Sequence, residues 1–259
     1  MNKRIGLYAL VFVVIAALVH GAYLGYIWPA AQLAIDEARE AGLATPRTVA
    51  VVLKDVEQEI CIILALFCFV LLIEKCYRVY MQRYVFDHDF LQPGDAEKDS
   101  ASTPLQRLES LPDDIQREPL VQTIAHSFRR FEATRDIQNA ADAIRSSVES
   151  TAMKLESGNT LIRYFIWTIP SIGFVGTVRG IGAALSEADK ALAGDIASMT
   201  ENLGVAFNST FVALLLSIVL MGALYLLQGL QDDLVIKIEE YCDEKVVKHM
   251  AAAAVDVNA

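Results

Sequence analysis

Cysteine and basic residues are both scarce in this sequence. Only four cysteines occur in 259 residues, and none of them forms a CxxC pair, so the sequence predicts neither a disulfide framework nor a zinc site. Acidic residues outnumber Lys and Arg by 32 to 22, which gives a formal net charge of −10. Because no basic face is clustered, nucleic-acid binding is not expected either.

Long hydrophobic runs, in contrast, are abundant. The chain is 54% hydrophobic with a mean hydropathy of +0.37, a combination with high charge that a single soluble domain rarely shows. Four stretches are long enough, or nearly so, to cross a hydrocarbon core: 5–28, 59–73, 161–185 and 204–227. The sequence therefore predicts an all-α integral membrane protein with four transmembrane helices, of which the last two extend into the cytoplasm as a helical bundle.

The first run has two interpretations. Lys3 and Arg4 precede it, and small residues in "WPAAQ" follow it, as in a cleaved signal peptide. The run is longer than a usual signal-peptide core, however, and it ends with Tyr23, Tyr26 and Trp28, which suit the aromatic belt of a permanent span.

Basic residues near the segment ends predict the orientation. In a four-span arrangement they fall on one side, which the positive-inside rule assigns to the cytoplasm: Lys3, Arg4, Lys75, Arg78, Arg83, Lys154, Arg163 and Lys237. Both termini are therefore expected in the cytoplasm.

This orientation divides the chain into eight segments. The expected transmembrane helices are 1–28, 56–81, 161–185 and 204–228, and the expected periplasmic loops are 29–55 and 186–203. Residues 82–160 are expected to form a cytoplasmic linker and helical region, and 229–259 a cytoplasmic C-terminal helix.

Apolar residues at helical spacing mark the cytoplasmic helices. One such face runs from Leu120 to Phe131, a second follows a four-three repeat over 137–162, and a third continues the last span over 230–242. The simplest interpretation is helix packing, which would build a bundle on which another protein could dock. Gly158 and Asn159 are possible breaks in the second helix.

Small residues form a stripe on each of the last two spans. The stripe of the third span consists of Gly173, Gly176, Thr177, Gly180 and Ala184. That of the fourth span consists of Ala206, Thr210, Ala213 and Ser217, with Asn208 and Ser209 beside it. Such stripes allow two helix backbones to approach closely, so the two helices are expected to face each other or to line a shared cavity.

The two threonines have a local and a functional interpretation. A lone threonine in a membrane helix usually donates to its own carbonyl at i−4. Here Thr177 and Thr210 both lie in small-residue stripes, at similar distances from the outer ends of their spans, which favours a shared role. No Asp or Glu lies in the interior of any predicted span, and a proton path needs a titratable group there. If the chain conducts protons, the carboxylate comes from a partner.

Arg179 is a charge within the third span, roughly 9 Å of helix from its outer end. It either snorkels to the outer headgroups or faces the protein interior. In the second case it pairs with Glu187, with Glu201 or with a carboxylate of a partner.

The two motifs "IPSIGFVGTVRGIGAAL" at 169–185 and "LGVAFNSTFVALLLSIVL" at 203–220 together resemble the paired motif of the MotA/TolQ/ExbB proton-channel family. The resemblance implies a homopentamer around the single membrane helices of two ExbD/TolR/MotB-like partners, whose aspartate takes up protons. By position, Thr177 and Thr210 match the family's pore-facing threonines, and Pro170 matches its proline. Asn208 and Ser217 are further expected contacts to the ion or the partner helix.

The layout resembles flagellar MotA, with four spans and a large cytoplasmic segment between the second and third, whereas "GFVGTVRGIG" reads more like TolQ and ExbB. The expected function is that of an A-type motor subunit in the bacterial inner membrane, not an enzyme, without cofactor or metal, and driven by H⁺ or Na⁺. Two alternative functions are compatible with the sequence: a non-conducting oligomeric scaffold and a self-contained channel.

Overall fold

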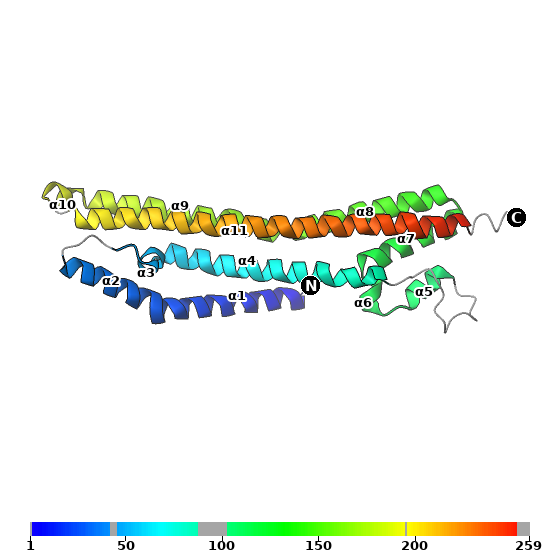
Figure 1. Cartoon of the computed structure of the whole chain (residues 1–259), viewed down its shortest axis with the longest axis horizontal. Helices are drawn as coiled ribbons and strands as arrows, with labels where there is room; N and C mark the ends of the chain where they lie inside the picture. The colour runs from blue at the N-terminus through cyan, green and yellow to red at the C-terminus, as the bar shows by residue number, and fades with distance from the viewer. Residues whose placement is uncertain (1, 42–45, 88–102, 195, 253–259) are drawn as a thin grey trace. The chain divides into compact units, whose positions relative to one another are not determined.

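The structure is a computed structural model that describes residues 2–41, 46–87, 103–194 and 196–252. Within these residues every regular element is a helix (Figure 1). The chain divides into two compact units, one of Met1–Ile73 with Leu161–Tyr225 and one of Glu74–Thr160 with Leu226–Ala259. Helices α4 and α11 contribute residues to both units.

Four helices are long and apolar enough to cross a membrane, as the sequence predicted, so the chain is a multi-pass membrane protein. Their extents, each including neighbouring helical turns, are Ile5–Glu40, Val56–Phe86, Ile137–Ser186 and Ala197–Ala252. All four continue well beyond the roughly 20 residues that a bilayer core requires, so part of each helix lies outside the hydrocarbon.

The first unit holds the apolar helices and the segments that join them. Its elements are α1 (Asn2–Ala22), the π-helical turn η1 (Tyr23–Ile27), α2 (Trp28–Glu40), α3 (Val49–Leu53), most of α4 (Val56–Met81), α9 (Thr160–Ser186), α10 (Ala188–Leu192) and the first part of α11 (Ala197–Tyr241). Aromatic rings join three of its helices, because Phe67 of α4 makes edge-to-face contacts with Phe12 of α1 at 5.3 Å and with Phe165 of α9 at 5.7 Å.

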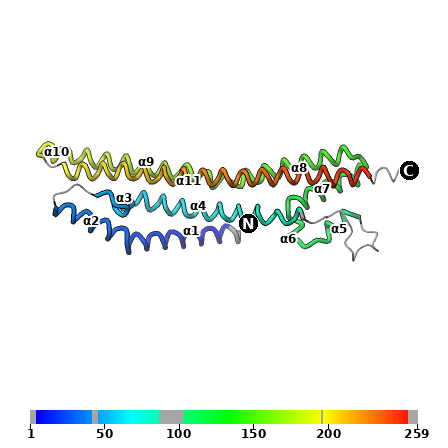
Figure 2. Tube along the Cα trace, viewed as in Figure 1, coloured from blue at the N-terminus to red at the C-terminus, as the bar shows by residue number. Residues whose placement is uncertain are grey.

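The segment 29–55, expected as a loop, is helical over much of its length. Helix α2 continues α1 through η1, and α3 precedes α4 (Figure 2). Pro29 does not stop the helix: it follows directly on the π-helical turn η1, at the junction with α2, and a π-helical turn is one of the irregularities by which a long helix accommodates a local disruption. Residues 42–45 lie outside the described part of the chain.

The second unit has a conventional apolar core. Its elements are the end of α4, the 3₁₀ turn η2 (Gln82–Asp87), α5 (Pro104–Ser110), α6 (Asp113–Gln116), α7 (Pro119–Thr134), α8 (Ile137–Gly158), the end of α11 and the π-helical turn η3 (Cys242–Val247). Ile124 of α7, Ile144 of α8 and Ile238 of α11 are each at most 2% exposed in this core. The apolar faces expected over 120–131, 137–162 and 230–242 therefore pack together.

Helices α8 and α9 are separated by a single residue. Asn159 is the C-cap of α8, fully buried, and its side-chain amide donates to Gln231 Oε1 at 2.7 Å. The break that the sequence suggested at Gly158 and Asn159 is thus confined to one position, whose polar side chain is bonded inside the second unit.

Candidate functional site

The glycine stripe of α9 packs against the small-residue stripe of α11, and both belong to the first unit. A Cβ atom placed on Gly173 would lie 2.4 Å from Ala213 Cβ, and one placed on Gly176 would lie 2.6 Å from Ser209 Cβ. Gly180 faces Ala206 in the same way, at 2.8 Å. Position numbers rise along α9 as they fall along α11, so the two helices run antiparallel.

This packing decides between the two arrangements that the sequence left open. The two stripes were expected to face each other or to line a shared cavity, and Ala206, Ser209 and Ala213 of the same chain fill the glycine stripe. A stripe of Gly and Ala favours close approach of any helix, and the sequence alone does not say whose helix that is.

Thr177 and Thr210 meet across this interface. Their hydroxyl oxygens are in direct contact, so one hydroxyl can donate to the other, and the carbonyl oxygen of Ala206 lies within hydrogen-bonding distance of both, 3.0 Å from Thr177 Oγ1 and 3.4 Å from Thr210 Oγ1. Thr177 Oγ1 lies 3.2 Å from Gly173 O as well. The two hydroxyl protons are thus shared between the local i−4 carbonyls and the contact between the threonines, and both side chains are half-buried.

Pro170 and Ser217 form a second matched pair. Proline has no N–H, so Pro170 leaves the carbonyl of Ile166 without its helical donor. The buried Ser217 hydroxyl donates to that carbonyl at 3.0 Å. Ser217 lies seven residues, or roughly 10 Å of helix, beyond Thr210, so this contact is separate from the threonine pair. Asn208 is half-buried on α11 and takes no part in either cluster.

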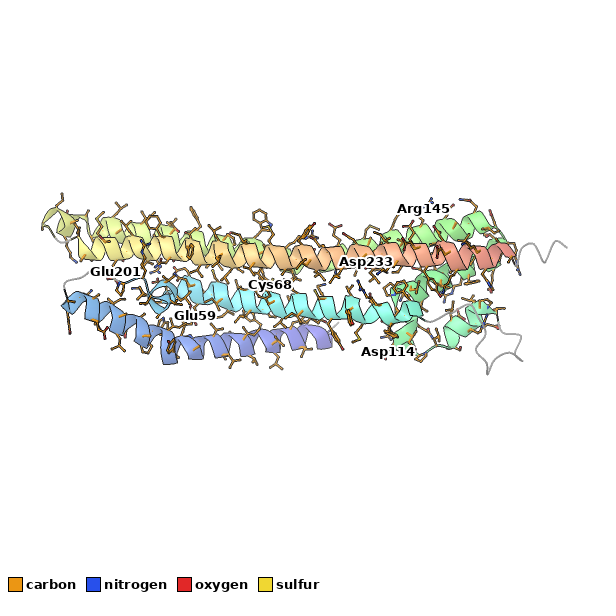
Figure 3. All side chains as sticks on the ribbon, viewed as in Figure 1. Glu59, Cys68, Asp114, Arg145, Glu201 and Asp233 are labelled. Atoms are coloured by element: carbon orange, nitrogen blue, oxygen red, sulfur yellow. The ribbon has the colours of Figure 1, made fainter. Side chains whose placement is uncertain are left out.

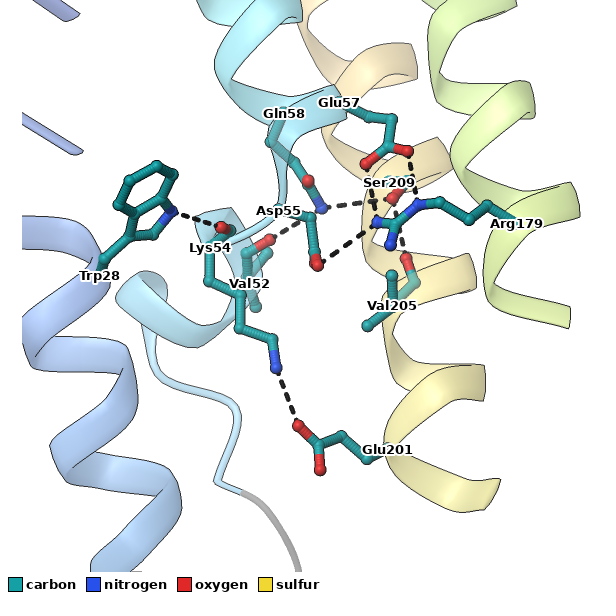
Figure 4. A network of polar contacts seen from close by, with 10 residues as sticks. All are labelled: Trp28, Val52, Lys54, Asp55, Glu57, Gln58, Arg179, Glu201, Val205 and Ser209. Atoms are coloured by element: carbon teal, nitrogen blue, oxygen red, sulfur yellow. Dashed lines mark hydrogen bonds and ion pairs between the residues drawn. The ribbon is translucent and has the colours of Figure 1, made fainter. Parts of the chain in front are cut away.

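Arg179 is held by Glu57 and Asp55, two acidic residues far from it in the sequence (Figure 4). Its Nε donates to Glu57 Oε1 at 2.7 Å and its Nη2 to Glu57 Oε2 at 2.8 Å, which is a two-pronged guanidinium–carboxylate pair. Asp55 Oδ1 lies 3.5 Å from the same Nη2. Glu201, one of the partners considered from the sequence, instead accepts from Lys54 at 2.9 Å.

Glu57 lies beside the threonine-bearing helices as well. Its Cγ would be 3.1 Å from a Cβ on Gly176, the residue before Thr177. The neighbouring Gln58 is fully buried, and its side-chain amide reaches Ser209 Oγ at 3.4 Å and Val52 O at 3.2 Å. The first turn of α4 is thereby bonded to α9 and α11 next to the threonine pair.

A second carboxylate of the same turn pairs with the first helix. Glu59 on α4 (Figure 3) is 6% exposed, and its Oε1 lies 2.7 Å from His20 Nδ1 of α1. The sequence places no acid in the interior of a span, and the structure adds that both acids of the first α4 turn point into the first unit. Burial raises the pKa of Asp55, just before this turn, although Lys54 and Arg179 act in the opposite direction.

Among the residues that the structure describes, no group of three or more His, Cys, Asp or Glu side chains is arranged to hold a metal ion. The site therefore consists of paired hydroxyls, small residues and a charge pair. Its groups can bond to a cation or to a helix, but the hydroxyls cannot themselves carry a proton charge at neutral pH.

Comparison with protein families gives one match. Residues 113–240 match the family model described as the MotA/TolQ/ExbB proton channel family. The matched part begins at α6 and includes all of α7 to α10 and α11 up to its penultimate residue, so it contains the threonine pair, Pro170, Ser217 and Arg179. Comparison with curated proteins and with solved structures returned no match.

Proposed function

Because the chain belongs to the MotA/TolQ/ExbB proton channel family, we propose that it is the ring-forming subunit of an ion-driven membrane motor. In this proposal, five copies surround the single membrane helices of two ExbD/TolR/MotB-like partner chains. The family is of a transporter type and not enzymatic, and the ion would be H⁺ or Na⁺. The complex would lie in the bacterial inner membrane, with both termini in the cytoplasm.

The observation that carries the proposal is the contact between Thr177 and Thr210 hydroxyls. Two half-buried hydroxyls and the carbonyl of Ala206 gather oxygen atoms at one point of the α9–α11 pair. Oxygen ligands of this kind replace part of the hydration shell of a passing cation. An aspartate of the partner helix would supply the titratable group that the span interiors of this chain lack.

The outer faces of α9 and α11 are suited to contacts with neighbours. Phe174 and Val178 of α9 are 64% and 57% exposed in the single chain, and Phe207 and Phe211 of α11 are 67% and 62% exposed. Since the glycine stripe is used within the subunit, these bulky apolar faces would contact adjacent subunits, the partner helices and lipid. The bundle of the second unit would pass torque or force to the driven machine.

A non-conducting oligomeric scaffold is the second candidate. The observation that favours it is that the Thr177 hydroxyl already has acceptors within one subunit, Ala206 O at 3.0 Å and Gly173 O at 3.2 Å, so no ion is needed to explain its presence. A scaffold should work equally well with valine at positions 177 and 210.

The native mass of the detergent-purified chain, expressed alone and with a candidate single-pass partner, tests the proposal. A mass of five chains that gains two partner chains supports it. A monomer or dimer that binds none of the tested single-pass proteins contradicts it.

A further inference from the structure

Arg179 raises a problem for a cation path through the threonine pair. It follows Thr177 by two residues on α9, which is roughly 3 Å along the helix axis. An unpaired guanidinium is always charged at physiological pH, and outside bulk water its repulsion of a second positive charge extends well beyond direct contact. A subunit that conducts cations therefore has to neutralise Arg179.

We propose that Glu57, assisted by Asp55, neutralises Arg179 and so keeps the Thr177–Thr210 hydroxyls open to a cation. Glu57 is in this sense a positioning residue for ion transport and does not itself bind the ion. The inference rests on the proposed function and adds to it a carboxylate from this chain.

The geometry of the pair fits neutralisation. The Glu57 carboxylate accepts two hydrogen bonds from the guanidinium, from Nε at 2.7 Å and from Nη2 at 2.8 Å. Bidentate pairs of this kind are among the strongest interactions between arginine and a carboxylate. The Glu57 and Asp55 side chains are only 12% and 13% exposed, whereas that of Arg179 is 52% exposed. The protein therefore encloses the two acidic side chains, and the more exposed Arg179 side chain extends from α9 to the start of α4, where they lie.

The other charges of the cluster complete the balance. Lys54 is the other cation drawn in the cluster, and it pairs with Glu201 at 2.9 Å (Figure 4). Arg39 also lies 3.9 Å from the same Glu201 carboxylate. When all are ionised, the three acids Asp55, Glu57 and Glu201 therefore balance the three bases Arg39, Lys54 and Arg179, so the paired cluster presents no excess positive charge to a cation.

The pair is also fixed relative to the threonines. Gly176 leaves room for the Glu57 side chain, since a Cβ at Gly176 would meet Glu57 Cγ at 3.1 Å and Ser209 Oγ at 2.6 Å. Gln58 bonds the same turn of α4 to Ser209, the residue before Thr210. The charge pair and the hydroxyl pair thus share one layer of the first unit.

Measurements of proton flux distinguish neutralisation of Arg179 by Glu57 from a purely structural role of Glu57 in helix packing. The chain is purified with a candidate single-pass partner and placed in liposomes that contain a pH-sensitive dye, and a potassium diffusion potential drives proton entry. Glu57→Gln leaves Arg179 without its main counter-charge and should lower the flux about tenfold or more. Glu57→Gln combined with Arg179→Gln removes both charges and should restore the flux to within about twofold of wild type.

A matched control uses another ion pair. Asp233 accepts from Arg83 and from Lys237, each at 2.9 Å, in the second unit, so Asp233→Asn also removes a carboxylate from its basic partners, but far along α11 from Thr210. Its flux should equal that of wild type. The native mass of each variant complex shows whether it still assembles.

The outcomes are distinct. Loss in the single variant with recovery in the double variant supports the inference. Unchanged flux in Glu57→Gln, or a double variant as impaired as the single one, overturns it while the proposed function survives. If the wild-type complex moves no protons, the proposed function fails, and the inference fails with it.

Discussion

The Ser217 hydroxyl lies 3.0 Å from the carbonyl oxygen of Ile166, the group that Pro170 deprives of its helical donor. In a membrane each unsatisfied carbonyl is costly, and neighbouring Ser or Thr side chains are a known way to re-satisfy the backbone around a proline. Pro170 and Ser217 are therefore expected to depend on each other.

Ser217→Ala should lower the free energy of unfolding by about 1 kcal/mol, since it leaves a buried acceptor without a partner. Adding Pro170→Ala restores an N–H for Ile166, so the second change should recover most of the loss. Thermal unfolding in detergent of the two single variants and the double variant measures this coupling. Strictly additive effects would show that the two residues act separately.

Gly176→Ala should destabilise the α9–α11 pair. The added methyl would meet Ser209 Cβ at 2.6 Å, and overpacking of this kind costs about 1–3 kcal/mol. Gly182→Ala is the matched control on the same helix, because nothing lies within 4 Å of its added methyl. It should leave the melting temperature unchanged or raise it slightly, since Ala favours helix over Gly. Equal effects of the two changes would contradict the packing described for the stripe.

The Glu118 carboxyl group should make the stability of the second unit depend on pH. Burial raises the pKa of its carboxyl group, although a contact with Gln82 acts in the opposite direction. A raised pKa in the folded state means that ionisation opposes folding, so the contribution of Glu118 is most favourable below its unfolded pKa and is lost as the pH rises through the folded pKa. Glu118→Gln should therefore raise the melting temperature at pH 7 and change it less at pH 4.

Glu132→Gln is the control for this prediction. Glu132 lies on the same helix, α7, and is exposed, so its replacement should alter stability little at either pH. A gain from Glu118→Gln that is equal at pH 4 and pH 7 would exclude ionisation as its cause.

Local patterns predicted much of the architecture. Apolar length predicted the four long helices, and helical spacing predicted the faces that form the core of the second unit. The stripes around Gly176 and Ala206 predicted close helix contact, and the structure places the Thr177 and Thr210 hydroxyls in contact within it. These features repeat every three or four residues, so they are visible within a single helix.

Long-range partners were not predictable in the same way. Glu57 is 122 positions from Arg179 in the sequence and resembles an ordinary acid in the first turn of a helix, a position that the helix dipole alone explains. The hydrogen bond from Ser217 to Ile166 depends equally on the register of α9 against α11. Helix α2 was missed because its proline and charged residues resemble those of a loop.

Proton flux through the reconstituted complex, compared between wild type and the Thr177→Val, Thr210→Val double variant, tests the central claim most directly. Valine keeps the shape of threonine and removes both hydroxyls, so the variant should retain its native mass and lose about tenfold or more of the flux. A variant complex that assembles normally and conducts as wild type does would contradict an ion path at the threonine pair and favour the scaffold.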